Sequence, residues 1–204
     1  MRRGPNPPPI RAAFIDRDGV INELAPDPLS GRPESPLRER DVVLVDGAAA
    51  ALRRLAAAGL LLVGVSNQPA AAKGTVSPAE LDAVQKRVIE LLDAEGVRFD
   101  AFRVCLHHPD GVVPELSGAC ECRKPAPGML LDAARELGID LAASWMIGDT
   151  DSDIEAGAAA GCRTALIEHP GSAHKRDQVT KPDVIAPDLE AVAGVILSAS
   201  QAPM

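Results

Sequence analysis

Carboxylates follow two apolar segments of the chain, one near each end of the sequence. Asp16 and Asp18 come directly after residues 12–15, and a second acidic stretch at residues 149–153 follows residues 145–147. Each apolar segment has the composition of a buried strand, and ligands of open α/β sheets bind at the carboxyl ends of the strands. If the two strands are neighbours, at least three carboxylates converge, and a hard cation such as Mg²⁺ is needed to offset their repulsion. The pattern therefore predicts a metal site suited to phosphoryl chemistry.

Asp16 and Asp18 are spaced so that one carboxylate can react while the other handles a proton. Gly19, directly behind them, lets the chain turn sharply. A carboxylate can attack phosphorus and form an aspartyl-phosphate. Taken alone, the same residues are equally consistent with a solvated turn or a calcium-binding loop. The pair therefore needs support from elsewhere in the chain before it indicates catalysis.

Three other polar positions could serve such a reaction. Ser66 directly follows the apolar residues 60–65, and its hydroxyl could donate to a phosphoryl oxygen or simply cap a turn. Lys124 could neutralise charge in a transition state, although a single lysine is usually a surface residue. Asp149 and Asp153 could hold the metal, or could cap and charge the first turn of a helix. Ser66 and Lys124, each taken alone, favour the structural alternative.

Together, and in this order, the four segments resemble the four signature motifs of the haloacid dehalogenase superfamily of phosphotransferases. The resemblance covers roughly residues 10–167, which is most of the chain. It implies four catalytic residues: Asp16 as nucleophile, Asp18 as acid and base, Ser66 as a phosphate-binding hydroxyl and Lys124 as a charge-stabilising cation. It also implies a Mg²⁺ site made by Asp16, Asp149 and the backbone carbonyl of Asp18, with Asp153 in support.

The cysteines indicate a second metal. Three thiolates and an imidazole gather over a short stretch and would form a closed set suited to structural Zn²⁺: Cys105, His107, Cys120 and Cys122. The spacing is only moderately specific, so buried or incidental cysteines remain an alternative. His108 is a competing ligand, but His107 stands two residues from Cys105 and can meet the same ion. Cys162 is expected to be a small core residue.

Within the superfamily, this cluster is similar to that of the D-glycero-D-manno-heptose 1,7-bisphosphate 7-phosphatases and of their relatives, the histidinol-phosphate phosphatases. Both groups share a core without a large cap domain and a zinc-stapled loop. The length of the segment between His107 and Cys120, and the sequence of residues 127–130, match the heptose group better. The resemblance implies these substrate contacts: Ser66, Asn67, Gln68, Lys73, Arg123 and Lys124.

Two positions depart from the family pattern. The stretch after Asp18, residues 22–40, is long, rich in proline and aligns poorly. Thr150 follows the metal-binding Asp149 where many members of the family have a lysine that reaches a phosphate. Loss of that cation could shift substrate preference but does not affect the first chemical step.

The elements that must position these residues alternate along the chain. Strand-like segments lie at residues 12–15, 60–65, 102–105, 144–147, 164–167 and 184–185. Helix-like segments lie at residues 48–58, from 78 onward after a capping box at Ser77, and at 129–137, 154–160 and 189–198. This alternation predicts an α/β, Rossmann-like parallel sheet with helices on both faces. Residues 10–204 are expected to form a single domain, with substrate recognition in the long irregular stretches 22–40 and 107–127.

The composition and net charge of the chain limit the kinds of molecule that it can bind. The chain has 204 residues, of which 46% are apolar, and a formal net charge of −8. That charge argues against nucleic acid or an anionic membrane as a partner. Residues 1–9 have arginines but no apolar stretch behind them, so they predict a disordered tail and not a secretory signal. Cysteines grouped with a histidine favour a reducing cytoplasm.

We therefore expect a monomeric, cytoplasmic, Mg²⁺-dependent phosphatase with a structural zinc, acting on a small phosphorylated sugar. The alternative enzyme is a histidinol-phosphate phosphatase. The alternative from another class is a catalytically silent, zinc-stapled binding module. The intact set of Asp16, Asp18, Lys124 and Asp149 argues against a silent module.

Overall fold

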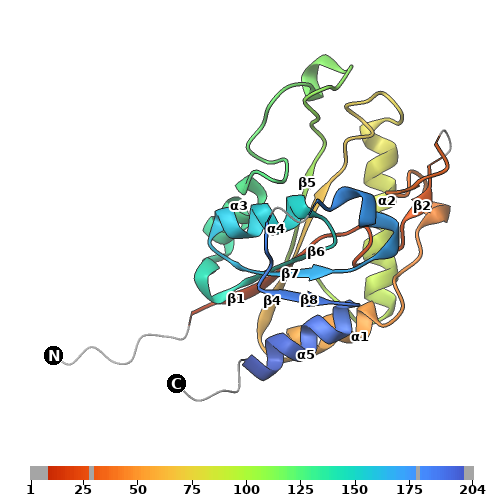
Figure 1. Ribbon diagram of the computed structural model, residues 1–204. Helices are drawn as coiled ribbons and strands as arrows, with labels where there is room; N and C mark the ends of the chain where they lie inside the picture. The colour runs from red at the N-terminus through yellow and green to blue at the C-terminus, as the bar shows by residue number, and fades with distance from the viewer. Residues whose placement is uncertain (1–8, 28–29, 178–179, 200–204) are drawn as a thin grey trace.

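The computed structural model describes residues 9–27, 30–177 and 180–199. Apart from Pro9, the tail predicted for residues 1–9 lies outside these ranges. One parallel sheet of six strands carries the fold, in the order β5-β4-β1-β6-β7-β8 (Figure 1). Its strands are β1 (Arg11–Ile15), β4 (Leu60–Asn67), β5 (Ala101–Cys105), β6 (Trp145–Gly148), β7 (Arg163–Ile167) and β8 (Val184–Ala186).

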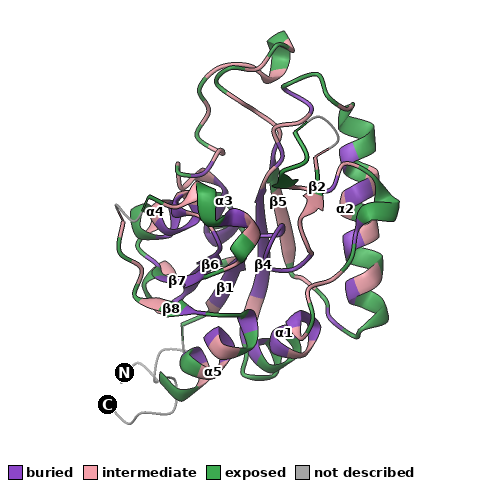
Figure 2. Ribbon diagram, turned by 45° about the vertical axis from the view of Figure 1, so that its right-hand side comes forward, coloured by how far each residue is buried: buried purple, intermediate pink, exposed green. Residues whose placement is uncertain are grey.

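The helices cover both faces of the sheet. The helices are α1 (Ala48–Ala57), α2 (Pro78–Ala94), α3 (Gly128–Leu137), α4 (Asp151–Ala160) and α5 (Leu189–Ala199). Residues of α1, α2 and α5 share one apolar core with Ala13 and Ile15 of β1. Residues of α3 and α4 share a second core with the alternate β1 residues, Ala12 and Phe14. Because successive side chains of a strand point to opposite faces, a strand covered on both sides must be apolar throughout. Figure 2 shows the buried sheet between these layers.

Local signals set most helix limits where they were predicted. The Ser77 hydroxyl accepts from the Glu80 backbone N–H, and the Glu80 carboxylate accepts from the Ser77 N–H, which opens α2 with a complete capping box. Helix α3 ends at Gly138, as expected. The start predicted for α4 at residue 154 is wrong, because Thr150 caps the helix and it begins at Asp151. Asp151 and Asp153 therefore belong to its first turn.

The irregular stretches contain small elements that the sequence pattern did not reveal. Strands β2 (Ala25–Pro26) and β3 (Pro33–Glu34) form an antiparallel pair within the stretch predicted as a loop. Short 3₁₀ turns add η1 (Glu39–Asp41), η2 (Pro114–Leu116), η3 (Leu141–Ala143) and η4 (Pro170–Lys175). Within the residues described, the insertion between β1 and β4 contains no larger domain, in agreement with the predicted core without a large cap. Residues 10–204 as one domain stay a prediction.

Among the helices described, none combines the length and the apolarity needed to span a membrane.

Candidate active site and metal clusters

Strands β1 and β6 lie side by side, which brings the two acidic segments together. Ile15 pairs with Ile147, and the Asp16 backbone N–H donates to the Ile147 carbonyl at 2.9 Å. The chain then leaves both strands at the same edge of the sheet. Carboxylate oxygens of Asp16, Asp149 and Asp153 consequently lie within 4.8 Å of one another, and all three residues are buried. We call these three residues the carboxylate cluster.

Gly19 allows this close approach. Its φ of +85° lies in the left-handed region, which favours glycine. A β-carbon at this position would stand 2.2 Å from a carboxylate oxygen of Asp149. Any other residue would therefore collide with the cluster. The turn after Asp18 is tight because two chain segments meet there.

Lys124 is the cation within the carboxylate cluster. Its ammonium lies 2.7 Å from Asp16 Oδ1 and 2.6 Å from Asp153 Oδ1, and it donates to the Val65 carbonyl at 2.7 Å. Burial alone would lower the pKa of Lys124, but the Asp153 and Asp16 carboxylates raise it, so the side chain stays charged. One lysine does not balance three carboxylates. Burial raises the pKa of Asp16 to about 7 despite the attraction of Lys124.

The cluster has the donor set of a Mg²⁺ site. Asp149 Oδ1 is buried and has no hydrogen-bond partner among the residues described. Burial, followed by the charges of Asp16 and Asp153, raises the pKa of Asp149 well above its usual range. A buried carboxylate with an unused oxygen beside two others fits a hard divalent cation, which prefers oxygen ligands. Asp153 also accepts from the Thr150 N–H and hydroxyl, so it fixes the start of α4 as well.

The Asp18 carboxylate accepts hydrogen bonds from three neighbouring side chains. Arg17 donates to both of its oxygens at 3.1 Å, Asn22 donates at 2.9 Å, and Gln68 donates at 2.6 Å. Burial would raise the pKa of Asp18, but the Arg17 guanidinium and the Asn22 amide hold it below its usual value. Arg17 is itself fully buried and also donates to Gln85 of α2. Asp18 is therefore an anion in this arrangement.

Ser66 and Asn67, the last two residues of β4, make different contacts. The Ser66 hydroxyl accepts from Gln68 at 2.8 Å, and Ser66 is absent from the residues found to line the cavity above the cluster. The Asn67 amide oxygen accepts from the Lys124 N–H at 3.1 Å, and its nitrogen donates to the Lys124 carbonyl at 3.0 Å. Both ends of the amide thus hold the backbone of Lys124. Asn67 therefore positions that lysine, and because it also lines the cavity, its expected contact with substrate stays a prediction.

A cavity of about 560 Å³ opens above the carboxylate cluster. Asp16, Asp18 and Asp149 line it, together with Gln68 from the turn after β4. Among the described residues, four basic side chains also line it: Lys73, Arg123, Lys124 and Lys175. The cavity thus brings the carboxylate cluster and several cations together, as a site for a phosphorylated molecule beside a metal requires, and Asp27 and Glu34 also line it.

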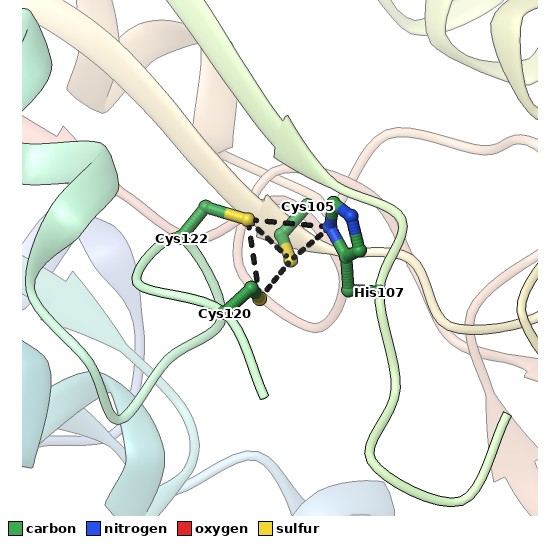
Figure 3. Close-up of side chains that lie close together, drawn as sticks. All are labelled: Cys105, His107, Cys120 and Cys122. Carbon is green, nitrogen blue, oxygen red and sulfur yellow. Dashed lines mark hydrogen bonds between the residues drawn. The ribbon is translucent and has the colours of Figure 1, made fainter. Parts of the chain in front are cut away.

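The thiol cluster lies at the end of β5, in a different part of the same edge (Figure 3). It consists of Cys105, His107, Cys120 and Cys122, whose ligand atoms all lie within 4.8 Å of one another. The sulfur atoms are 2.9 to 3.6 Å apart, and His107 Nδ1 lies 3.8 Å from the Cys105 sulfur and 3.5 Å from the Cys122 sulfur. The cysteines are free thiols. A tetrahedral ion with bonds of ~2.3 Å would hold its sulfurs ~3.8 Å apart, so this set fits Zn²⁺.

Burial and the neighbouring thiols raise the pKa of Cys122, so without a cation this thiol would stay protonated. His107 is the imidazole of the cluster, as expected. His108 instead accepts from the Asp110 N–H through its Nδ1. Cys162 is buried in the core on the α3 and α4 face, again as expected.

Several functional contacts could not be found from the sequence. Arg17 stands between the two aspartates, yet nothing in its spacing shows that it would be buried against Asp18. Lys175 is the last residue of η4, where no motif marks it. Arg176 donates through one nitrogen to the carbonyl of Asp149 at 3.1 Å and to three other acceptors. These residues act through tertiary contacts, and a single sequence carries no local signal for such contacts.

The fold and the two clusters define a hydrolase of the haloacid dehalogenase class. Residues 121–192 match the family described as "HAD-hyrolase-like". A solved structure of the D,D-heptose 1,7-bisphosphate phosphatase from B. bronchiseptica, complexed with magnesium and phosphate, superposes with a TM-score of 0.76 at 30% identity. The match covers 93% of this chain and 99% of that chain.

Sequence relatives narrow the class. The chain is 42% identical over 150 residues to the D-glycero-β-D-manno-heptose-1,7-bisphosphate 7-phosphatase of Rhodopseudomonas palustris, covering 74% of this chain and 79% of the relative. It is 39% identical over 163 residues to the protein of the same name from Yersinia pestis, covering 79% and 82%. The chain belongs to this family of phosphatases, whose members are Mg²⁺-dependent phosphoric monoester hydrolases.

Proposed function

We propose that this protein removes the 7-phosphate of D-glycero-β-D-manno-heptose 1,7-bisphosphate. The observation that carries the proposal is the cavity itself, where a buried carboxylate cluster with its lysine lies beneath walls that carry further cations. One phosphate can react at the base while another binds higher up. The names of the relatives at 42% and 39% identity supply the sugar.

Asp16 is the proposed nucleophile. One of its oxygens attacks phosphorus, the bond from phosphorus to the sugar oxygen breaks, and the sugar leaves with a proton. Water then attacks the aspartyl-phosphate and releases inorganic phosphate and the free carboxylate. A Mg²⁺ ion held by Asp16 and Asp149 would supply charge neutralisation at the phosphoryl oxygens. Lys124, 2.7 Å from Asp16, adds a fixed positive charge at the same place.

Asp18 is the proposed acid and base. To give a proton to the leaving sugar oxygen, Asp18 must first be protonated and must exchange one of the hydrogen bonds from Arg17, Asn22 or Gln68 for that oxygen. That step leaves Asp18 as the carboxylate, which its hydrogen bonds stabilise, and in the second step this carboxylate accepts a proton from the attacking water. Gln68 donates to both Asp18 and Ser66, so a phosphate that binds the Ser66 hydroxyl would also alter the hydrogen bond from Gln68 to Asp18.

Arg123 is assigned to the part of the substrate that does not react. It lines the cavity, and its Nη1 donates to the His107 carbonyl at 3.2 Å, so the thiol cluster fixes its direction. A guanidinium binds a phosphate through paired hydrogen bonds. Lys73 lines the same cavity and adds charge there. Action as a monomer in the cytoplasm stays a prediction from composition.

A substrate panel tests the proposal. The purified protein, supplied with Mg²⁺, is assayed for phosphate release from the heptose 1,7-bisphosphate, from the heptose 1-phosphate and 7-phosphate, and from histidinol phosphate. We expect the bisphosphate to have the highest kcat/KM and to lose its 7-phosphate. Efficient release from histidinol phosphate, with little from the bisphosphate, would overturn the proposal in favour of the alternative enzyme.

A further inference from the structure

Lys175 is a cation of the cavity that the carboxylate cluster does not use. Lys124 is committed to Asp16 and Asp153, whereas Lys175 lines the cavity and pairs with Glu34 Oε2 at 2.7 Å. Among the described residues, the ammonium donates this one hydrogen bond, although it has three donors. Its side chain is about one-third exposed. It can therefore keep Glu34 and still donate to an anion in the cavity.

The segment that carries Lys175 is fixed to the active site on both sides. Arg176 donates to the carbonyl of Asp149 at 3.1 Å, and the Ser172 hydroxyl donates to the same carbonyl at 3.2 Å. The Asp177 backbone N–H donates to the Asp151 carboxylate at 2.6 Å. These contacts tie η4 and the residues after it to the loop between β6 and α4. The place of Lys175 relative to the reacting group is thus set by the fold.

The wall next to Asp149 has no other source of positive charge close in sequence. Thr150 follows Asp149, and its hydroxyl donates to the Asp153 carboxylate at 2.6 Å, which uses it as a helix cap. Ser152, the next cavity residue on that segment, is neutral. A phosphate placed there meets the carboxylates of the cluster and needs a cation. Arg176 directs its Nη1 at backbone carbonyls and the Ser172 hydroxyl, so Lys175 is the basic residue of this segment that lines the cavity.

We propose that Lys175 binds the phosphate of the substrate that is not transferred, sharing it with Arg123, and so sets the preference for a bisphosphate. The inference rests on the proposed function. It assigns Lys175 to the second phosphate because its ammonium pairs with Glu34 of β3, and not with a carboxylate at the base of the cavity. The phosphate would take up donors that Glu34 leaves free, and Glu34 would hold the ammonium ready for it.

The test compares kcat and KM for the heptose bisphosphate and for the 7-monophosphate in three variants. Lys175→Ala should raise KM for the bisphosphate roughly 10- to 100-fold, the range for a charge-assisted hydrogen bond to phosphate, with kcat and the monophosphate kinetics nearly unchanged. Lys175→Arg should restore most of the loss. Lys86→Ala is the matched control, because it breaks an exposed lysine–aspartate pair of the same 2.7 Å length on α2.

Glu34→Gln separates binding from a structural role. If the ion pair only joins β3 to η4, Glu34→Gln and Lys175→Ala should have the same effect, which would overturn the inference. If Lys175 binds phosphate, Glu34→Gln releases the ammonium and leaves KM for the bisphosphate unchanged or lower. A wild-type enzyme with no preference for the bisphosphate overturns the proposed function and this inference together. A wild-type preference that Lys175→Ala retains overturns this inference alone.

Discussion

The carboxylate cluster and the thiol cluster lie at the same edge of the sheet but are built differently. Asp16 and Asp149 continue from paired central strands, and Lys124 already offsets part of their charge. In the thiol cluster, Cys105 ends the edge strand β5, and the other three ligands come from the irregular stretch between β5 and α3. The sheet therefore positions the first cluster, whereas the second is formed by an irregular loop that a Zn²⁺ ion would hold together.

Arg123 and Lys124 show how near the two clusters are. They are consecutive, yet Arg123 donates to the carbonyl of His107 in the thiol cluster and Lys124 reaches Asp16 and Asp153 in the carboxylate cluster. The loop of the thiol cluster therefore places one cation beside Asp16 and Asp153 and a second cation in the lining of the cavity. A loss of zinc should disturb catalysis through these two residues and not through the sheet.

The largest effect is expected from the carboxylate cluster. Asp16→Asn removes the nucleophile and a Mg²⁺ ligand together, so turnover should fall by about 10⁴-fold or more. The melting temperature should change little, because the sheet still holds the cluster. Steady-state kinetics and thermal melting measure the two effects. Asp132→Asn, at an exposed position on α3, serves as the control.

Near-normal turnover of Asp16→Asn would exclude an aspartyl-phosphate route. Loss of the fold in this variant would contradict the view that the sheet alone builds the cluster.

The next largest effects are expected from substitution of the two consecutive cations, Lys124 and Arg123, and they should fall on different kinetic constants. Lys124→Ala should lower kcat about 100-fold or more, because it removes a fixed charge beside the reacting phosphate. It should also destabilise the fold by on the order of 3 kcal/mol, since buried carboxylates lose their partner. Arg123→Ala should instead raise KM for the bisphosphate about tenfold with little change in kcat. Bisphosphate kinetics that do not respond to Arg123→Ala would remove the link between the thiol loop and the substrate.

How much of this arrangement the sequence predicts depends on how local each signal is. Apolar runs placed Asp16 and Asp149 at strand ends, and the cysteine spacing placed His107 correctly over His108. These features are encoded within a few residues. Two other contacts join residues that lie far apart in the sequence: Asn67 holds Lys124, and Lys175 pairs with Glu34. Arg17 is buried against Asp18, although arginine side chains are usually exposed. No local pattern encodes such contacts.

Substitution of a zinc ligand should have a smaller effect, and we expect it mainly on the thermal stability of the protein. The purified protein should hold about one Zn²⁺ per chain, since four ligands close the site. Cys120→Ser should lower zinc content and reduce the melting temperature by roughly 5–10 °C, for a loss of about 2–3 kcal/mol at ~2–4 °C per kcal/mol. Cys162→Ala, a buried cysteine outside the cluster, should keep its zinc. Removal of Mg²⁺ should stop turnover without this shift.

Zinc-free protein with unchanged melting and activity would show that the thiol cluster is incidental. It would also show that the position of Arg123 does not depend on the metal.

The smallest expected effect is a difference in alkylation rate between Cys162 and the thiol cluster. Burial raises the pKa of the Cys162 thiol to about 12, so at pH 8 almost none of it is thiolate. Hydrogen bonds from Cys122 and Cys105 lower the pKa of Cys120, which is partly exposed, so in native protein stripped of zinc alkylation should modify Cys120 well before Cys162. With zinc bound, both should react slowly. Mass spectrometry of the labelled peptides measures the order. Labelling of Cys162 first would mean that the core on the α3 and α4 face opens more readily than the loop of the thiol cluster. That result would contradict the view that the sheet and its core are the more stable part of the molecule.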